Sequence, residues 1–412
     1  MNLKNLDRRL VTILLIVFVQ MLGAAMILPI LPLYAQREFD LSPQVIALLV
    51  TAFFAAQFVA GPFLGRLSDK RGRIPVLILS QIGTVISFVM LAGAQSAWVL
   101  FLARILDGIT GGNIIVAQAY ITDITPREKR TESLGYIFAV FGLGFVIGPA
   151  LGGFLSAALG PRVPYVIAAA AALAVVLLTW FTLEETVTPE QQQASSNRQR
   201  GGISPGEIVS NRPLLLILLV AFIGQSALGL LQSTFALFAE EVLFEGSSPE
   251  AATLGVGLLL AVFGLTQFST QTFLLRRLLR RFGEYRLVIL GNISRMAGSF
   301  LFALAATPLL GATASVFFAM GLGLMMPSLQ SLTTGTVDDE VRGGVLGLYQ
   351  STLSLSTIIS TALGGLFFAM ATALPYWIAG TMAAIALIPS VVLFLRYGHI
   401  EAGPRSKPAG VD

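Results

Sequence analysis

The sequence of 412 residues has no cysteine, one histidine and few charged residues. Without cysteine the chain can form no disulfide, no thiolate metal site and no cysteine nucleophile. The single histidine, His399, lies in the polar C-terminal tail, so no imidazole can carry protons within an apolar segment. Charged residues make up 12% of the chain, about half of what is usual in soluble globular proteins. This balance argues against a secreted enzyme, a nucleic-acid-binding protein and a disordered chain.

Long apolar runs dominate the sequence instead. Apolar residues make up 55% of the chain, and the mean hydropathy is +0.81. A helix that crosses a bilayer needs about 20 mostly apolar residues. We therefore predict an all-α membrane protein with twelve spans, at 10–35, 44–65, 74–95, 97–122, 133–159, 162–183, 213–239, 251–275, 286–306, 308–334, 344–371 and 374–396.

A polar segment divides these spans into two groups of six. We predict an N-terminal bundle at 1–183, a linker at 184–212, a C-terminal bundle at 213–396 and a tail at 397–412. Lysine and arginine collect in alternate connections, and the other connections hold only Arg37 and Arg162. Because positive charge stays in the cytoplasm, both termini and the linker are expected there.

The two groups of spans also repeat each other. Residues 150–153 and 362–365 both read Ala-Leu-Gly-Gly, a shift of 212, and the loop glycines Gly72 and Gly283 are shifted by 211. A constant shift indicates two six-helix bundles in parallel topology. Such an architecture places a substrate site between the bundles and works by alternating access.

The connection between spans two and three carries Gly65, Asp69, Gly72 and Arg73. A basic loop here could follow from charge orientation alone. Its spacing, however, resembles the cytoplasmic signature of the major facilitator superfamily. The resemblance implies the major facilitator fold and a latch that stabilises the outward-open state, with Asp123 as a further member.

Span four carries Arg104 and Asp107 on one helical face with Gly111 and Gln118. Charges at membrane depth are costly and normally face a partner or a polar cavity. Arg-x3-Gly-x2-Gly resembles the family motif in which the arginine is associated with proton transfer. We therefore consider two hypotheses for Arg104 and Asp107: proton coupling, or a static pair within the helix.

Span five carries a stripe of small residues, Gly144, Gly148 and Gly152, with Pro149 and Gly153 beside it. Such stripes allow close helix packing, and proline removes a backbone donor. The pattern is similar to the signature that separates drug/proton antiporters from uptake symporters in the superfamily. The resemblance implies an antiporter hinge.

The end of span one, Gly23 to Pro32, resembles a further signature of the twelve-span drug/proton antiporters, and the chain is closest to their tetracycline-exporter branch. That branch has acidic residues where this sequence has Gln20, Ser87 and Arg295. The differences argue against the handling of cation-bound tetracycline. Arg295 would suit an anionic or zwitterionic substrate, or it is a packing residue.

Polar and soft side chains near mid-span are candidates for the substrate cavity, although each could instead serve helix packing. The candidates are Gln20, Asn113, Gln118, Gln225, Gln232, Arg295, Met325 and Gln330.

The resemblance implies a proton-coupled antiporter in the bacterial inner membrane that exports lipophilic small molecules or drugs. The proton gradient would supply the energy, with no cofactor, no metal and no catalysed reaction. Expected partners are the small lipophilic substrate, protons and membrane lipid, but no nucleic acid, and a monomer is expected. The alternatives are a lipid or lysolipid translocator on the same fold and a proton-coupled uptake symporter for an organic anion.

Overall fold

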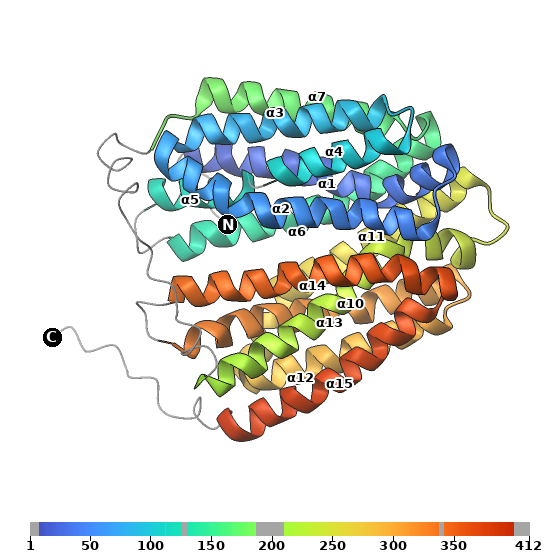
Figure 1. The fold of residues 1–412 in the computed structure, drawn as a ribbon. Helices are drawn as coiled ribbons and strands as arrows, with labels where there is room; N and C mark the ends of the chain where they lie inside the picture. Colours follow the sequence, from blue (N-terminus) through green and yellow to red (C-terminus); the bar gives the residue numbers. More distant parts are fainter. Residues whose placement is uncertain (1–7, 112, 126–129, 187–209, 338–341, 399–412) are drawn as a thin grey trace.

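The computed structural model describes residues 8–111, 113–125, 130–186, 210–337 and 342–398, and their regular structure is helical. Figure 1 shows the helices α1 to α7 as one bundle, above the helices α10 to α15. The first group comprises α1 (Arg8–Phe39), α2 (Pro43–Arg71), α3 (Arg73–Ala92), α4 (Ala97–Thr110), α5 (Asn113–Ile124), α6 (Arg130–Leu159) and α7 (Val163–Thr182). The second comprises α10 (Arg212–Phe238), the one-turn π-helix η3 (Ala239–Leu243), α11 (Pro249–Ser269), the π-helix η4 (Thr270–Leu274), α12 (Leu275–Leu304), α13 (Pro308–Gly335), α14 (Arg342–Met370) and α15 (Leu374–Tyr397).

Two helix pairs make most of the contacts between the bundles: α2 packs on α14, and α6 packs on α11. The α6–α11 contact depends on small residues. A Cβ atom on Gly153 would lie 2.9 Å from the backbone oxygen of Thr253, and one on Gly257 would collide with the backbone oxygen of Pro149. The bundles therefore touch backbone to backbone, which is how membrane helices pack without a hydrophobic driving force between them.

The outer surface of the helices is apolar. Trp180, Phe181, Leu304 and Leu309 are examples of large apolar side chains that lie exposed there. In water such a surface would be unusual, but it fits the hydrocarbon of a bilayer. Within the described residues, ten helical stretches are long and apolar enough to cross a membrane.

The count differs from the twelve predicted spans at two places. The fourth predicted span is divided into α4 and α5: a turn at Gly111 follows α4, and position 112 lies outside the described residues. Glycine is a poor helix former. The eighth and ninth predicted spans lie in one helical stretch, Pro249–Leu304. Within that stretch the backbone turns at Gly283, where φ is 75°. The exact number of twelve stays a prediction, as do the domain boundaries, and most of the predicted linker lies outside the described residues.

The bundles have two ends, which we name after their arginines. The Arg73 end contains the connection from α2 to α3, the last residues of α7 and the start of α10. The Arg37 end contains the connection from α1 to α2, η3 and the start of α11. The polar contacts differ between these ends.

Candidate transport site

A glycine turn positions the residues of the predicted latch. Helix α2 ends at Arg71 and α3 begins at Arg73, with Gly72 between them at φ 97°. Only glycine adopts this conformation readily. A Cβ atom on Gly72 would also collide with the carboxylate of Glu185. The turn brings Arg73 over the end of α2.

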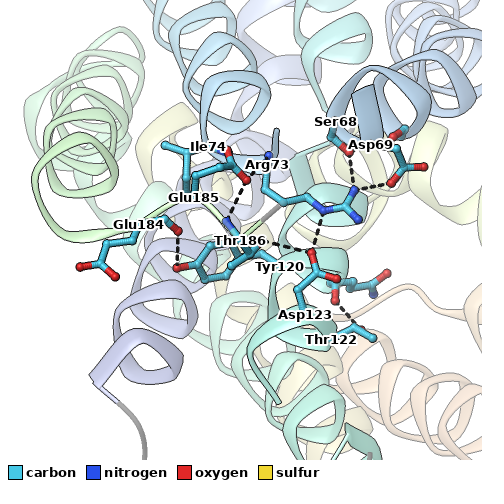
Figure 2. Close-up of polar contacts among 12 residues, drawn as sticks. Ser68, Asp69, Arg73, Ile74, Tyr120, Thr122, Asp123, Glu184, Glu185 and Thr186 are labelled. Carbon is cyan, nitrogen blue, oxygen red and sulfur yellow. Dashed lines mark hydrogen bonds and ion pairs between the residues drawn. The ribbon is translucent and has the colours of Figure 1, made fainter. Parts of the chain in front are cut away.

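Arg73 is the centre of the polar cluster at this end (Figure 2). Its Nη1 atom donates to Asp69 Oδ1 at 2.5 Å and to Ser68 Oγ at 2.9 Å, and its Nε donates to Asp123 Oδ2 at 2.9 Å. Ser68 Oγ donates in turn to the backbone oxygen of Gly65. The structure thus brings all five predicted latch residues into one region, in which Arg73 joins α2, α3 and α5 by charge-assisted hydrogen bonds.

Glu185 is a member of this cluster that the motif did not indicate. Its two carboxylate oxygens accept hydrogen bonds from the backbone N–H groups of Arg73 and Ile74, at 2.9 and 3.0 Å. These are free donors at the N-terminus of α3, where a negative charge is favourable. Thr186 donates to Asp123 at 3.1 Å, as Figure 2 shows. The segment that follows α7 is therefore bonded to the start of α3 and to α5.

The predicted Arg104–Asp107 pair lies inside the first bundle. Arg104 Nη1 and Asp107 Oδ2 are 2.7 Å apart, and both side chains are about 10% exposed. The guanidinium also lies over the ring of Phe53 of α2, 4.2 Å from its centroid. Burying either charge alone would be costly, so each makes the other tolerable. Protonation of Asp107 would leave Arg104 without its counter-ion and change the balance of the pair.

At the Arg37 end, polar contacts cross between the bundles. Arg37 forms an ion pair with Glu240 of η3, whose Oε1 accepts from both Nε and Nη2. Its Nη1 donates to Thr253 Oγ1 at 3.0 Å, and its Nη2 donates to the backbone oxygen of Pro249 at 3.1 Å. Gln36 Nε2 donates to Glu241 at 3.4 Å. One arginine of α1 thus holds both η3 and the start of α11.

A cavity of about 520 Å³ lies between α6 and the second bundle. Three predicted cavity residues line it: Gln225, Gln232 and Gln330. Gln225 Nε2 donates to Thr357 Oγ1 at 2.8 Å. Gln232 Oε1 is buried and accepts no hydrogen bond from the described residues. The cavity offers an apolar space with amide groups at its wall.

The other predicted cavity residues do not line this space. Gln20 and Gln118 are half-buried elsewhere in the first bundle, and the side chain of Asn113 lies outside what the structure describes. Arg295 and Met325 are fully buried. Arg295 Nη1 lies 3.5 Å from Met325 Sδ, while Nη2 donates to the backbone oxygen of Gly224. These two residues lie inside the second bundle, next to the cavity wall.

The comparison with protein families matches this architecture. The model of the Major Facilitator Superfamily matches residues 13–251 and 243–411 of the chain. The chain belongs to the major facilitator superfamily. It is therefore a multi-pass membrane transporter rather than an enzyme, and transporters of this superfamily bind small-molecule substrates and couple their movement to ions.

Individual relatives agree with the family. The chain is 32% identical over 359 residues to a class E tetracycline resistance protein from Escherichia coli, covering 86% of each sequence. It is 27% identical to multidrug resistance protein 2 from Bacillus subtilis (strain 168), covering 90% of this chain and 91% of the relative. The crystal structure of a mutant of the nucleoside transporter NupG has the same fold, with a TM-score of 0.75 and 16% identity, over 95% of this chain and all of that one.

In this major facilitator protein, the predicted hinge residues face two different helices. A Cβ atom on Gly148 would lie 2.6 Å from the Cβ of Ala25, and one on Gly152 would lie 2.5 Å from the backbone oxygen of Met26. Gly144 likewise faces α1, whereas Gly153 faces α11. Helix α6 continues through Pro149. Helix α6 therefore lies in close contact with both bundles, where a change in its position would move one relative to the other.

Proposed function

We propose that this transporter is a proton-coupled antiporter that exports lipophilic small molecules across the bacterial inner membrane. The observation that carries the proposal is the buried Arg104–Asp107 pair, because it places one carboxylate at membrane depth where its protonation would change a local charge balance. The relatives named as tetracycline and multidrug resistance proteins support export as the direction.

The orientation follows from the positive charges. The Arg73 end carries the basic connections, so we infer that it faces the cytoplasm, together with both termini. The Arg37 end then faces outward. Because the ion pair between the bundles lies at the Arg37 end, the structure corresponds to a state closed to the outside. The protein would act as a monomer whose apolar outer surface contacts lipid.

The proposed cycle uses the pair and the latch in turn. Substrate enters the cavity from the cytoplasm while Arg104 and Asp107 are paired. The bundles then separate at the Arg37 end, and the cluster around Arg73 stabilises the outward-open state. Protonation of Asp107 from outside accompanies the release of substrate. The transporter then returns to the state that is open to the cytoplasm, where the proton leaves.

The test is dye efflux from pump-deficient bacteria that express wild type or Asp107→Asn, each with and without an uncoupler. We expect uncoupler-sensitive efflux in wild type and its loss in Asp107→Asn at equal protein levels. Glu245→Gln, at an exposed carboxylate, is the matched control and should retain efflux.

Full efflux by Asp107→Asn would refute the assignment of the proton carrier. If wild-type protein gave no efflux but moved a labelled lysolipid, the lipid-translocator alternative would replace the proposal.

A further inference from the structure

The wall of the 520 Å³ cavity has an unusual composition. None of its described lining residues is charged. Four phenylalanines contribute rings, two from α6 and two from α11, namely Phe141, Phe145, Phe263 and Phe268. The polar part of the wall is dominated by six glutamines, Gln225, Gln232, Gln267, Gln271, Gln330 and Gln350.

This composition favours one kind of ligand. Phenylalanine rings pack against flat aromatic compounds by offset stacking or edge contacts. Each glutamine amide can both donate and accept hydrogen bonds, so it matches carbonyl, hydroxyl and amide groups. The buried Gln232 Oε1, which accepts no hydrogen bond from the described residues, would accept one from a ligand N–H or O–H.

The preference of the cavity for ligand charge depends on Arg295, which lies next to residues of the cavity wall. Phenylalanine rings alone would attract a cation. Arg295, however, bonds to Gly224, the neighbour of the wall residue Gln225, and contacts Met325, the neighbour of the wall residue Met326. Its guanidinium is fully buried and forms no ion pair with a carboxylate of the described residues. It also lies over Phe318, at 5.2 Å from the ring centroid.

A positive charge at this position must act on the ligand. The side chains around it are apolar, so screening by water is weak. A unit charge about 10 Å away, at an effective dielectric constant of about 20, changes the binding constant of another unit charge by roughly tenfold. The field of Arg295 therefore opposes a cation in the cavity and favours an anion, and it offsets part of the attraction that the rings exert on a cation.

We propose that the cavity binds uncharged and anionic aromatic compounds with hydrogen-bonding groups in preference to cationic ones, with Arg295 as the specificity-determining residue. This inference rests on the proposed export function for its biological use, but the cavity chemistry itself can be measured separately. It distinguishes this protein from an exporter of lipophilic cations, for which a carboxylate in the cavity would be the natural partner.

The test uses three probes that share one ring system: 2-naphthamide, 2-naphthalenesulfonate and trimethyl-2-naphthylammonium. Saturable binding to the full chain in nanodiscs is measured by equilibrium dialysis, with empty nanodiscs as the control for partition into lipid. We expect the amide and the sulfonate to bind at least tenfold more tightly than the ammonium compound. Equal binding of the ammonium compound, or no binding of any probe, would overturn the inference.

Two variants of Arg295 test its role. Arg295→Met removes the charge with a side chain of similar length. It should weaken sulfonate binding and strengthen ammonium binding by about tenfold each, so the preference for sulfonate over ammonium should fall by roughly 100-fold. Arg295→Lys keeps the charge and should keep the preference. An unchanged ratio in folded Arg295→Met would show that Arg295 does not set specificity.

A variant in the wall covers the case in which Arg295→Met does not fold. Gln232→Glu adds a carboxylate to the cavity and should raise the affinity for the ammonium probe by about tenfold. No gain would contradict the position of the binding site. Failure of the export proposal is recognised separately: the probes would then bind in the expected order while uncoupler-sensitive efflux is absent.

Discussion

The ion pair between Arg37 and Glu240 should control how often the outer end opens. It joins α1 to η3, and the same guanidinium holds Thr253 and the backbone oxygen of Pro249. All these partners belong to the other bundle, so the contacts must break when the bundles separate there. Glu240→Gln removes the charge but leaves a side chain of the same size.

The expected size of the effect of Glu240→Gln follows from the solvent exposure of the Arg37 and Glu240 side chains. The two side chains are 31% and 22% exposed, so water screens part of the attraction. Exposed pairs contribute about 0.2–1 kcal/mol, and the two donors on one carboxylate place this pair near the upper value, about 1 kcal/mol. That energy corresponds to about a fivefold change in the ratio of the two states. Glu240→Gln should therefore raise the outer-open population about fivefold.

Spin-label distances can measure this change directly. Because the chain has no cysteine, Ser96→Cys and Ser247→Cys would label only these two exposed positions, one on each bundle at the Arg37 end. We expect Glu240→Gln to increase the long-distance component, while Glu245→Gln, which alters an exposed carboxylate nearby, leaves it unchanged. A double-mutant cycle with Arg37→Gln should give a coupling of about 1 kcal/mol. A coupling near zero, with unchanged distances, would refute the gate.

Three further changes test other parts of the structure. Glu185→Ala removes the carboxylate that caps α3, which should lower the free energy of unfolding by about 1 kcal/mol. Tm should then fall by roughly 1–3 °C in thermal unfolding, and an unchanged Tm would show that the cap adds no stability. Asp69→Asn should lower the outward-open fraction measured by spin labels at the Arg73 end, and an identical distribution would argue against the latch. Gly152→Ala places a Cβ 2.5 Å from the backbone oxygen of Met26 and should cost about 1–3 kcal/mol with reduced transport. Gly335→Ala, which has open space around it, is its control, and equal transport by both variants would contradict the close-packing argument.

The sequence predicted most helices because bilayer spans need long uninterrupted apolar runs. The predicted span 308–334 corresponds to α13 (Pro308–Gly335), and 374–396 corresponds to α15 (Leu374–Tyr397). Prediction of helices from apolar runs fails where hydropathy and helix geometry disagree. The hydropathy of the run 97–122 shows no break, although α4 ends at Thr110, and only the glycine pair Gly111-Gly112 in the sequence marks the place.

The contacts of individual side chains were harder to predict from the sequence. The latch motif indicated Asp69, Arg73 and Asp123, but not Glu185, which is 112 residues from Arg73 in the sequence. The acidic pair Glu184–Glu185 directly after the sixth apolar run was the available signal. For Arg295 the sequence showed a charge at membrane depth, but a helical pattern alone could not show whether it points into a cavity or into the bundle.

The two ends of the molecule together explain how a transition could start. At the Arg73 end, the ion pairs that the structure describes join helices of the first bundle to one another. At the Arg37 end, the Arg37–Glu240 pair joins the two bundles. In between, α6 contacts α1 and α11 through glycines that offer no side chain to interlock. The glycines of α6 therefore place no interlocking side chain in the way of movement between α6 and α11, and the Arg37–Glu240 pair, which must break when the outer end opens, favours the closed state. Substrate and proton need to change these contacts by only a few kcal/mol, about the amount that a population shift requires.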